Sequence, residues 1–583
     1  MLRRALAAAL AATLASAAVV LLPATPAAAA DSGTFNVLAY NVAGLPESIS
    51  SAPTPRESAT TAIGQRLGAY DIVHVEEDFN YHAALYAADN HPYRTPTSGG
   101  AAFGSGLNTL SDYAYDDGDF ERVHWDSCQY DSGDCLTPKG FTFMRVRLSE
   151  GVYVDMYNLH TNAGTNSGDE ASRASNLAQL TGFIQSHSAG NAVIVMGDTN
   201  TRYTRAADTI ASFVGDNGLT DAWVKLIRGG VAPAAGSPTL SCDSANPTND
   251  CEVVDKIMYR GSRFVTLNAS SYNNEHAGFL EDGTGKMLSD HDPISARFKW
   301  TTNPAFQFSE QAGGPHGDYF NDVDRVAWGA QATAISLRAG ERVDQMGVTL
   351  GDGTQLTHGG TGGSYSSLAL GSTEYVTSAY LCQAEYKSHT RIFYAKFTTN
   401  LGRTLAGGST TSDCVTRTAP AGWQIAGFHG RSADEVDKIG FIYTPNDVML
   451  VNRATGKCLD VDGWSTADSA NVRQWTCHGG VNQRWRIEPL ADGTVRIVNQ
   501  GSNKPLDVVG CGTADGTNIQ QYTWWDNPCQ RWSLLPTDGG WTRLQNPNSG
   551  KVADVANCGN ADGTDVRLWS WLNNPCQQWQ TQT

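Results

Sequence analysis

The C-terminal part of the chain repeats one pattern three times, and this repeat constrains the fold more than any other feature. Asp460, Asp507 and Asp554 are 47 residues apart. The same interval separates three tryptophans that each close a Gln-x-Trp sequence: Trp485, Trp532 and Trp579. A unit of this length is too small to bury a core alone, so the period predicts three copies that share one core. We expect the closing tryptophans to belong to that core rather than to a ligand site.

The N-terminus, residues 1–30, has the order of an export signal. Arg3 and Arg4 precede an Ala/Leu/Val run, and Ala28–Ala30 place small residues before Asp31. That order predicts a cleaved signal peptide, and two prolines within the run disfavour the alternative of a membrane anchor. No later stretch reaches the ~18 uninterrupted apolar residues of a membrane span. We therefore expect a secreted, extracellular protein without a transmembrane segment.

Twelve cysteines lie in neighbouring pairs along the sequence. An even count, local spacing and an export signal favour six disulfides over metal thiolates, and no Cys-x-x-Cys is present. The expected disulfides are Cys128 with Cys135, Cys242 with Cys251, Cys382 with Cys414, Cys458 with Cys477, Cys511 with Cys529, and Cys558 with Cys576.

Length and charge narrow the class further. The 583 residues exceed what a single core organises, so about two to four domains are expected. The formal net charge of −18 argues against a broad basic surface for gripping nucleic acid. It does not exclude an enzyme that touches nucleic acid briefly through a metal ion.

Residues 31–300 alternate apolar runs with helical periodicity, which predicts a layered α/β domain. The expected strands are 35–41, 71–75, 152–157 and 192–196, and the expected helix is 172–186. A linker follows at 301–304. Residues 305–445 are rich in Gly, Thr and Ser, and Val343–Gly347 and Val436–Gly440 repeat one strand motif. Such a repeat predicts a pseudo-symmetric all-β unit.

Polar side chains follow the predicted strands of the first segment. Hard cations take carboxylate and carbonyl oxygens, and Mg²⁺ also keeps waters and substrate phosphate. The predicted metal ligands are Glu77, Asn41 and Asp290. Asp198 and Asn200 share one face by alternation in Gly197-Asp198-Thr199-Asn200.

Two histidines complete the predicted site. His291 can take a proton from water at neutral pH if a carboxylate holds its other nitrogen, and Asp255 is the expected carboxylate. His160 is expected to donate to a phosphate oxygen as charge builds in the transition state. Each element alone is as well explained by a turn or a structural histidine. The conjunction of five such motifs at strand ends favours hydrolysis of a phosphate ester.

This ordered set resembles the endonuclease/exonuclease/phosphatase superfamily, which includes deoxyribonucleases and bacterial neutral sphingomyelinases. The resemblance covers residues 34–300 and implies a four-layer αββα sandwich with Mg²⁺-dependent phosphoester cleavage. Two positions depart from the family pattern: Glu76 replaces the usual Gln, and Leu159 the usual Thr. Neither departure removes a group that the chemistry needs.

The substrate is less constrained than the reaction. Lys139-Gly140 ahead of His160, and Gly104–Leu107 followed by Ser111, resemble the sphingomyelinase-type members. We therefore expect a phospholipase C-like or sphingomyelinase-like lipid phosphodiesterase. The alternatives are a secreted deoxyribonuclease-like nuclease and, in another class, a lectin whose hydrolase-like domain is inactive.

Residues 305–445 resemble jacalin-type lectins, which implies a β-prism. Gly313–Asp318 match the family's glycine loop, and Gly427–Tyr443 match its final sugar-loop strand. The resemblance implies that Asp437 contacts sugar hydroxyls. Ala433 stands where the family has a glycine, so a purely structural prism is the alternative.

The 47-residue repeats resemble the ricin B-type β-trefoil, which implies sugar binding by an Asp, an aromatic platform and polar groups before the closing Trp. The implied residues are Asp460, Trp475, Asn482 and Gln483 in the first repeat, Asp507, Tyr522 and Gln530 in the second, and Asp554, Trp569 and Gln577 in the third. Cys529 and Cys576 replace the Asn of the first repeat, which favours the first repeat as the working site.

The whole sequence thus predicts a multidomain chain: signal peptide 1–30, αββα catalytic domain 31–300, β-prism 305–445 and β-trefoil 447–583. The predicted protein is a monomeric Mg²⁺-dependent phosphodiesterase. Its two lectin modules would hold it against glycan-bearing surfaces and raise its local concentration there.

Overall fold

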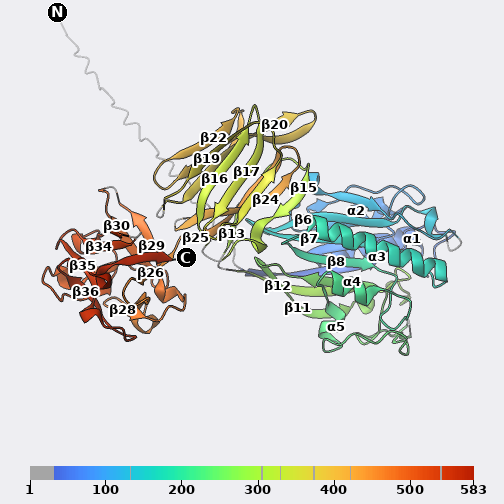
Figure 1. The fold of residues 1–583 in the computed structure, drawn as a ribbon. Helices are drawn as coiled ribbons and strands as arrows, with labels where there is room; N and C mark the ends of the chain where they lie inside the picture. The colour runs from blue at the N-terminus through green and yellow to red at the C-terminus, as the bar shows by residue number, and fades with distance from the viewer. Residues whose placement is uncertain are drawn as a thin grey trace, which may run out of the picture.

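The structure, a computed structural model, describes residues 32–582 except 131–132, 244, 304–305, 328–329, 372–373, 421, 491 and 539–540. The predicted signal peptide and Pro304 of the predicted linker lie outside the described residues. Figure 1 shows three bodies along the chain, which we name the sandwich, the prism and the trefoil. Among the described residues, no helix combines the length and apolar character needed to span a bilayer.

The sandwich contains two six-stranded sheets. The first has the order β11-β12-β1-β2-β4-β3, and the second has the order β5-β6-β7-β8-β10-β9. The first sheet comprises β1 (Ser32–Asn41), β2 (Ile72–Glu76), β3 (Tyr93–Arg94), β4 (Asn108–Ser111), β11 (Val265–Asn274) and β12 (Ile294–Thr302). The second comprises β5 (Glu121–His124), β6 (Gly140–Ser149), β7 (Val152–His160), β8 (Ala192–Asp198), β9 (Thr220–Asp221) and β10 (Asp255–Arg260).

Helices cover the outer faces of both sheets. On the first sheet, α1 (Arg56–Leu67) and α2 (His82–Ala88) bury Ile63 and Leu85 in one cluster with Leu38 and Val73. On the second sheet, α3 (Ser167–His187) and α4 (Ile210–Asp216) lie over β7 and β8, with α5 (Ala222–Leu226) beside β10. The predicted four-layer αββα architecture is confirmed.

The predicted strands correspond to β1, β2, β7 and β8. The predicted helix 172–186 begins earlier, at Ser167. Asn166 explains the earlier start, because its side chain accepts from the backbone N–H groups of Gly168 and Asp169. The Asp169 carboxylate in turn accepts from the Asn166 N–H, completing a capping box. Capping therefore sets the start of this helix five residues before its apolar periodicity becomes visible.

The prism consists of three antiparallel sheets. One is built from β13 (Gln307–Phe308), β14 (Ala312–Gly313), β15 (Asp318–Asn321), β24 (Trp423–Ser432) and β25 (Val436–Pro445). The second has β16 (Ala332–Ala339), β17 (Val343–Leu350), β18 (Gln355–Gly359) and β19 (Ser364–Ala369). The third has β20 (Val376–Tyr386), β21 (His389–Thr399), β22 (Thr404–Gly408) and β23 (Asp413–Thr418).

The trefoil buries one shared core, as the repeat predicts. Each closing tryptophan is fully buried, and its indole N–H donates to the backbone carbonyl of Leu459, Leu506 or Ala553 at 3.0, 3.0 or 3.1 Å. The strands are β26 (Val448–Asn452), β27 (Cys458–Val461), β28 (Val472–Trp475), β29 (Arg484–Pro489), β30 (Val495–Asn499), β31 (Leu506–Val508), β32 (Ile519–Gln521), β33 (Ser533–Pro536), β34 (Thr542–Asn546), β35 (Lys551–Val555), β36 (Val566–Trp569) and β37 (Trp579–Gln582).

Disulfides occur in all three bodies, and all six predicted pairs are present. In the sandwich, Cys135 is bonded to Cys128 and Cys251 is bonded to Cys242. In the prism, Cys414 of β23 is bonded to Cys382 of the neighbouring β20, which lies directly opposite it in the sheet. In the trefoil, the bonded pairs are Cys458 with Cys477, Cys511 with Cys529, and Cys558 with Cys576. The described residues contain no free cysteine.

The fold class is therefore the predicted one: an α/β sandwich, then a β-prism, then a β-trefoil. We retain 31–300, 305–445 and 447–583 as proposed domain limits.

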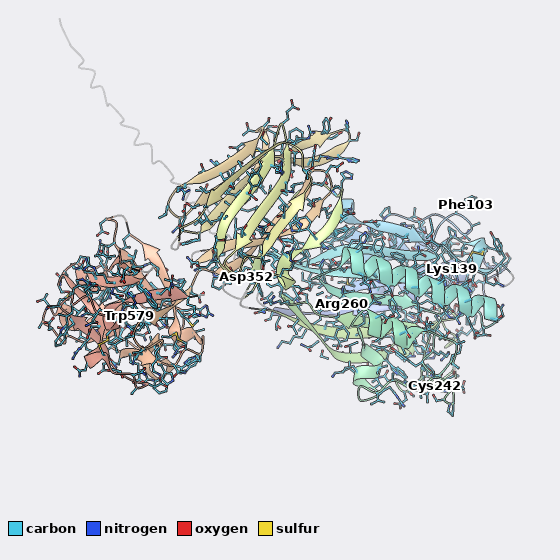
Figure 2. All side chains as sticks on the ribbon, in the orientation of Figure 1. Phe103, Lys139, Cys242, Arg260, Asp352 and Trp579 are labelled. Atoms are coloured by element: carbon cyan, nitrogen blue, oxygen red, sulfur yellow. A yellow bond between two sulfur atoms is a disulfide. The ribbon has the colours of Figure 1, made fainter. Side chains whose placement is uncertain are left out.

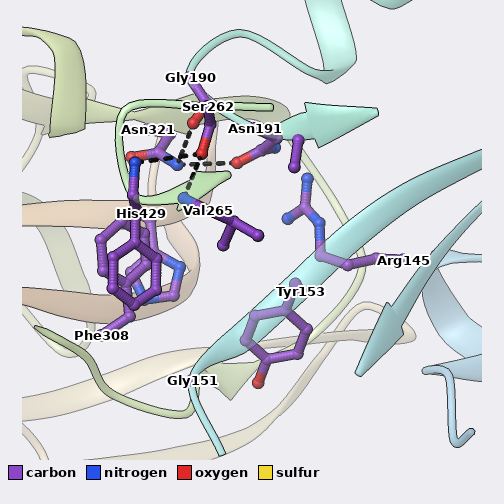
Figure 3. Close-up of a pocket in the computed structure, with 12 residues that line it drawn as sticks. Arg145, Gly151, Tyr153, Gly190, Asn191, Ser262, Val265, Phe308, Asn321 and His429 are labelled. Carbon is purple, nitrogen blue, oxygen red and sulfur yellow. Dashed lines mark hydrogen bonds between the residues drawn. The ribbon is translucent and has the colours of Figure 1, made fainter. Parts of the chain in front are cut away.

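The sandwich and the prism share a polar interface. Lys438 of the prism pairs with Asp119 at 2.7 Å, and Arg431 pairs with the same carboxylate at 3.2 Å. A small pocket also lies between the two bodies, where Asn321 donates to Asn191 at 2.7 Å (Figure 3). This pocket borders the starts of β7 and β8, the ends remote from the predicted catalytic residues.

Candidate active site

Strand register brings the predicted side chains to one edge of the sandwich. In the first sheet, parallel pairing aligns Asn41 with Glu76, so Glu77 follows directly at the edge. In the second sheet, His160 aligns with Asp198, which lies opposite Asp255. The two sheets meet at this edge, because the Asn41 side-chain amide donates to Asp198 Oδ2 at 3.3 Å.

A histidine and two carboxylates form the centre of the site. His291 Nδ1 lies 3.0 Å from Asp255 Oδ2, and His291 Nε2 lies 3.8 Å from Asp198 Oδ2. Burial lowers the pKa of His291, but the Asp255 and Asp198 carboxylates outweigh burial and raise that pKa well above its ordinary value. Asp255 is thus placed as expected, on the nitrogen that faces away from Asp198.

Asp198 lies between the other side chains of the site: Asn41, His160 and His291 all face its Oδ2. Its Oδ1 accepts from the Asn200 backbone N–H at 2.9 Å, and its Oδ2 lies 3.3 Å from His160 Nε2. Burial raises the pKa of Asp198, but His291 and His160 outweigh burial and hold it below its ordinary value. Asp198 is therefore a buried anion at neutral pH.

His160 is buried and neutral. Burial, together with the nearby Lys139 ammonium, lowers its pKa to about 3. A neutral imidazole donates from one nitrogen only, and Nε2 faces Asp198 while Nδ1 is buried with no hydrogen-bond partner among the described residues. Donation from His160 to a phosphate oxygen therefore stays a prediction.

Asn200 lies on the rim of the site in a left-handed backbone conformation, with a φ of 47°. Its side-chain amide donates to the Thr161 carbonyl at 3.2 Å. This contact ties the end of β8 to the end of β7. The second N–H of the same amide can donate to a substrate oxygen.

The predicted metal ligands border the same centre. Burial raises the pKa of Glu77, and the nearby Asp290 carboxylate raises it too, whereas Lys139, His291 and the Asn41 amide oppose the shift. Asp290 is exposed, and its carboxylate accepts from the Ser51 hydroxyl and, at 3.4 Å, from the Ser289 hydroxyl.

A tight turn presents Glu77. Its backbone has a φ of 55°, and its carbonyl accepts from the Gly44 and Phe79 N–H groups at 2.9 Å each. A Cβ on Gly44 would lie 2.3 Å from that carbonyl oxygen, so only glycine fits there. Glycine at position 44 is therefore part of how the chain positions Glu77.

One group of three potential metal-binding side chains was found in the described part of the chain: Asp198, Asp255 and His291, whose ligand atoms lie within 4.8 Å of one another. This possible metal site differs from the predicted set of Glu77, Asn41 and Asp290. In the structure, the Asp255–His291 hydrogen bond already engages two of its three members.

Sequence reasoning did not place two further groups at the site. Lys139 donates to the Thr161 carbonyl at 3.4 Å and pairs with Asp134, so a cation lies beside the anionic centre. Glu76 is fully buried, and neither of its oxygens has a hydrogen-bond partner in the part of the chain that is described. Burial, with Asp255 and Asp198 nearby, raises its pKa well above the ordinary value. The sequence offered one signal for Glu76, namely its position at the end of the apolar run that forms β2. A carboxylate buried there is neutral unless it has a partner, so its presence in such a run is unusual.

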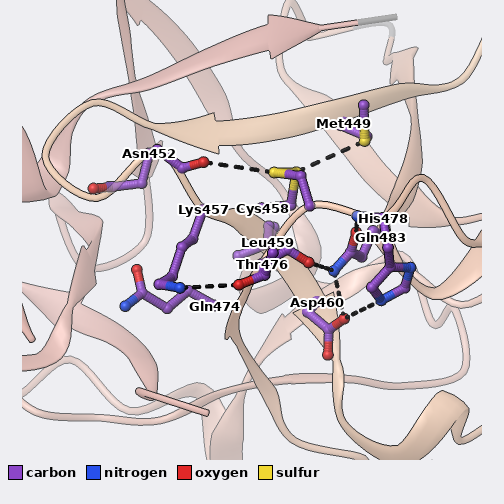
Figure 4. Close-up of a disulfide and its surroundings, with 12 residues drawn as sticks. Met449, Asn452, Lys457, Cys458, Leu459, Asp460, Gln474, Thr476, His478 and Gln483 are labelled. Atoms are coloured by element: carbon purple, nitrogen blue, oxygen red, sulfur yellow. Dashed lines mark hydrogen bonds and ion pairs between the residues drawn. A yellow bond between two sulfur atoms is a disulfide. The ribbon is translucent and has the colours of Figure 1, made fainter. Parts of the chain in front are cut away.

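The first trefoil repeat assembles its predicted polar residues. Asp460 is buried and accepts from Asn482 at 2.8 Å. It also accepts from Gln483 at 2.9 Å (Figure 4). Arg473 donates to the same carboxylate at 3.2 Å, and its guanidinium lies 4.2 Å from the centre of the Trp475 ring. One face of the predicted aromatic platform therefore carries an arginine.

The other two repeats keep the backbone contacts that Gln483 makes to Thr476 and His478 in the first repeat, and differ in the groups around the aspartate. In the second, Gln520 donates to Asp507 at 2.8 Å, while Gln530 contacts the backbone of Thr523 and Trp525. Tyr522 packs edge-on against Trp525. In the third, Arg567 donates to Asp554 at 3.4 Å and covers Trp569 at 4.1 Å, and Gln577 donates to the Ser570 carbonyl at 2.9 Å.

Asp437 of the prism is buried beside the glycine loop. A Cβ on Gly317 would lie 2.6 Å from its Oδ2, and Arg391 Nε lies 3.5 Å from its Oδ1. Pro315 of the same loop lies against Gly118 of the sandwich, where an added Cβ would be 2.9 Å away. The sandwich thus borders the loop in which the jacalin-type site is predicted.

These features define a class: an αββα sandwich with an acid–histidine centre at one sheet edge, followed by two all-β modules of lectin type. Comparison with known families agrees segment by segment. Residues 56–236 match the Endonuclease/Exonuclease/phosphatase family 2, residues 309–442 the jacalin-like lectin domain, and residues 441–522 and 528–583 the ricin-type beta-trefoil lectin domain-like family. The chain therefore joins domains of these three families in this order.

Individual relatives cover parts of the chain. It is 43% identical over 279 residues to a protein of Mycobacterium tuberculosis (strain ATCC 25618 / H37Rv) named sphingomyelinase, a match of 47% of this chain and 54% of that one. The chain thus spans about half the length of the curated relatives it matches. Sphingomyelinase C from Streptomyces griseocarneus is similar over 46% of this chain and 99% of that one, with 20% identity and a TM-score of 0.32. The designed protein ThreeFoil is similar over 24% of this chain and 98% of that one, with 39% identity and a TM-score of 0.23.

Proposed function

We propose that the protein is an exported, Mg²⁺-dependent phosphodiesterase of the phospholipase C or sphingomyelinase type, which hydrolyses the head-group phosphodiester of a lipid. The observation that carries this proposal is the position of His291 Nε2. This nitrogen faces the buried Asp198 anion, while Nδ1 is held by Asp255 at 3.0 Å. A base oriented by one carboxylate and facing a second is suited to water activation. The 43% identical relatives named sphingomyelinase support the same reaction class.

In this proposal the neutral form of His291 takes a proton from the attacking water. Because the two carboxylates raise the pKa of this imidazole, activity should increase with pH as His291 loses its proton. Asp255 fixes the tautomer with the proton on Nδ1 and stabilises the imidazolium that forms. Asp198 orients the water through its Oδ2, which the Asn41 amide holds at 3.3 Å. Lys139 and Asn200 are the groups placed to contact the phosphate oxygens as negative charge develops.

The donor set at the edge of the sandwich fits a divalent cation. Glu77 is a half-buried carboxylate whose pKa is raised by its desolvation and by the Asp290 carboxylate, so a cation there would relieve the cost of holding its charge. Glu77 and Asn41 would hold the ion, with Asp290 at the open side. A bound Mg²⁺ supplies Lewis-acid polarisation of the phosphoryl group and stabilises the leaving oxygen.

Exposed apolar side chains on loops next to the site favour a lipid over a nucleic acid. Phe103 is 87% exposed. It lies in the same loop as Gly106, whose carbonyl accepts a hydrogen bond from the backbone N–H of Asp78, the residue after Glu77. Ile49 is 65% exposed in the turn that leads to Ser51, the partner of Asp290. Figure 2 shows Phe103 and Lys139 toward the same end of the sandwich. Apolar groups around a site suit a bilayer surface, and the net charge of −18 opposes tight nucleic-acid binding.

A substrate panel tests the proposal. Purified full-length protein is assayed with Mg²⁺ on sphingomyelin vesicles, phosphatidylcholine vesicles and plasmid DNA, each with and without a chelator. We expect chelator-sensitive release of phosphocholine from lipid and no DNA cleavage. Cleavage of DNA alone would replace the lipid proposal with the nuclease. Activity that is unchanged in His291→Ala and Asp198→Ala would remove the site from the mechanism.

Export and glycan targeting complete the proposed function. Six disulfides are typical of proteins that mature outside the reducing cytosol. The prism and the trefoil would retain a monomeric enzyme at glycan-bearing surfaces, where weak binding by two linked modules raises its local concentration.

A further inference from the structure

The first trefoil repeat differs from the other two at two linked positions. Trp464 stands where the later repeats have Cys511 and Cys558, and Asn482 stands where they have Cys529 and Cys576. In the later repeats these cysteines form disulfides with each other. The first repeat thus replaces a covalent bridge with an aromatic and an amide side chain. Its own disulfide, between Cys458 and Cys477, lies elsewhere (Figure 4).

The backbone at Trp464 keeps the conformation of the bridged repeats. Trp464 has a φ of 56°, and Cys511 and Cys558 each have a φ of 53°. This left-handed conformation is unfavourable for a bulky side chain, and in the later repeats a disulfide holds it. At position 464 a tryptophan replaces the bridging cysteine, so no such bond can hold it. Strain retained without a structural need points to a functional side chain.

Trp464 is exposed but held in a defined place. Its side chain is 57% exposed, and its indole stacks on the His478 imidazole with ring centres 5.3 Å apart and planes inclined by 16°. The indole also lies over Gly480, where a Cβ would be 2.2 Å from Cη2. The later repeats have Asn527 and Asn574 at that position, so only the first repeat leaves room for this ring.

The stacked pair adjoins the buried polar groups of the repeat. His478 Nε2 lies 3.8 Å from Asp460 Oδ2, the oxygen that accepts from Asn482 at 2.8 Å. Asn482 Oδ1 is buried and accepts no hydrogen bond from any described residue. An aromatic wall beside a carboxylate and an unsatisfied amide oxygen is what a pyranose requires, since it presents one apolar C–H face and several hydroxyls.

Trp475, the aromatic platform implied by the family resemblance, is less available. The Arg473 guanidinium covers one face of its ring, and a Cβ on Gly563 of the third repeat would lie 3.7 Å from its Cζ3. Trp475 is therefore held between repeats, whereas Trp464 has an open indole face.

We propose that the trefoil has one carbohydrate site, in its first repeat, and that Trp464 is its aromatic platform, with Asp460 and Asn482 binding hydroxyls of a pyranoside. Disulfides occupy the matching positions in the second and third repeats and close them. The inference rests on the proposed glycan-binding role of the trefoil and is independent of the hydrolase reaction.

Calorimetric titration of the full-length protein with galactose, lactose and xylobiose tests this site. We expect at least one of these sugars to bind at a single Trp464-dependent site per chain, counted apart from any binding by the prism. Trp464→Ala should weaken that affinity about tenfold or more, Trp464→Phe should retain it within about threefold, and Trp475→Ala should weaken it less than Trp464→Ala does. Tyr365→Ala, which removes an exposed aromatic side chain of the prism, is the matched control and should change nothing.

A second variant converts the first repeat into a copy of the others. Trp464→Cys combined with Asn482→Cys places two cysteines on a backbone that already has the bridged conformation. We expect an added disulfide, detected by mass and by the absence of free thiols, an undiminished melting temperature and complete loss of sugar binding. Loss of binding in a protein at least as stable as the wild type separates recognition from folding.

Three outcomes overturn the inference: undiminished affinity in Trp464→Ala, a stoichiometry of three, or no binding of any of the three sugars. Hydrolysis of sphingomyelin by the same preparations is measured in parallel. A protein that binds sugar through Trp464 and hydrolyses nothing contradicts the proposed function and leaves this inference intact.

Discussion

At the scale of single residues, the hydrogen bond between Asp255 and His291 is the contact from which the proposed chemistry follows. It decides which imidazole nitrogen is free, because Asp255 holds Nδ1 at 3.0 Å and leaves Nε2 toward Asp198. An amide at position 255 can donate to that nitrogen and select the other tautomer.

Asp255→Asn should therefore lower kcat about 100- to 10,000-fold on sphingomyelin while KM changes little. The exposed Asp250 offers a matched control, and Asp250→Asn should keep wild-type rates. Steady-state kinetics with equal melting temperatures for the three proteins make the comparison. Wild-type turnover in Asp255→Asn would show that His291 does not depend on this carboxylate.

Gly44 tests the positioning of Glu77. Gly44→Ala forces a Cβ to 2.3 Å from the Glu77 carbonyl, so the turn must move and shift the carboxylate with it. We expect the Mg²⁺ concentration for half-maximal activity to rise about tenfold. Gly182→Ala in α3, where a Cβ meets no described atom within 4 Å, is the matched control and should leave the metal titration unchanged. Superimposable titrations for all three proteins would remove Glu77 from the metal site.

At the scale of secondary-structure elements, the closing tryptophans connect the three repeats. Trp532 is fully buried, and its indole N–H donates to the Leu506 carbonyl at 3.0 Å, so truncation leaves both a cavity and an unsatisfied acceptor. Trp532→Ala should lower the free energy of unfolding of the trefoil by about 3–5 kcal/mol. Differential scanning calorimetry of the full chain measures this as a shift of one transition.

The exposed Trp525 of the same repeat provides the comparison. Trp525→Ala should change the same free energy by less than about 0.5 kcal/mol. Equal shifts for the two variants would mean that the repeats do not share the core described here.

Element-level features were predictable from the sequence because they have local signals. Alternating apolar runs marked β1, β2, β7 and β8, and the groups at their ends indicated one sheet edge. The same reasoning placed the start of α3 too late, since capping by Asn166 is not an apolar signal. The 47-residue period and the cysteine spacing predicted the threefold repeat and its disulfides.

Contacts between distant side chains were not predictable in the same way. Nothing in the sequence shows that Arg473 covers Trp475, or that Trp464 stacks on His478. Lys139 lies 22 residues before Thr161, whose carbonyl it reaches, and its proximity to the end of β7 depends on the pairing of β6 with β7. Such contacts are set by register and rotamers, which a single sequence leaves open.

At the scale of the whole molecule, ionic contacts connect the sandwich to the prism. Glu310 of the prism accepts from Arg147 Nε at 2.8 Å, from the Gly151 N–H at 3.0 Å and from the Tyr153 hydroxyl. Burial raises the pKa of Glu310, but the hydrogen bonds from Tyr153, Gly151 and Arg147 outweigh burial and bring it below its ordinary value of 4.5.

This direction fixes the pH dependence of the interface. A carboxylate with a depressed pKa contributes its stability fully above its unfolded-state pKa, and this stability is lost as pH falls through the folded-state pKa. Glu310→Gln should therefore lower the free energy of unfolding by about 2 kcal/mol at pH 7, with a difference that shrinks below about pH 4.5. Thermal melts of both proteins between pH 3 and 8 measure this difference. A difference that stays constant over that range would contradict the assignment.

The central claim is that the acid–histidine centre hydrolyses a lipid phosphodiester with the help of a metal ion. The most direct measurement is phosphocholine release from sphingomyelin vesicles by the full-length protein in Mg²⁺, after chelation, and after Mg²⁺ is restored. The account predicts release with Mg²⁺, its loss on chelation and its return when Mg²⁺ is added back. Absence of release in Mg²⁺, or equal release with and without chelator, would contradict it.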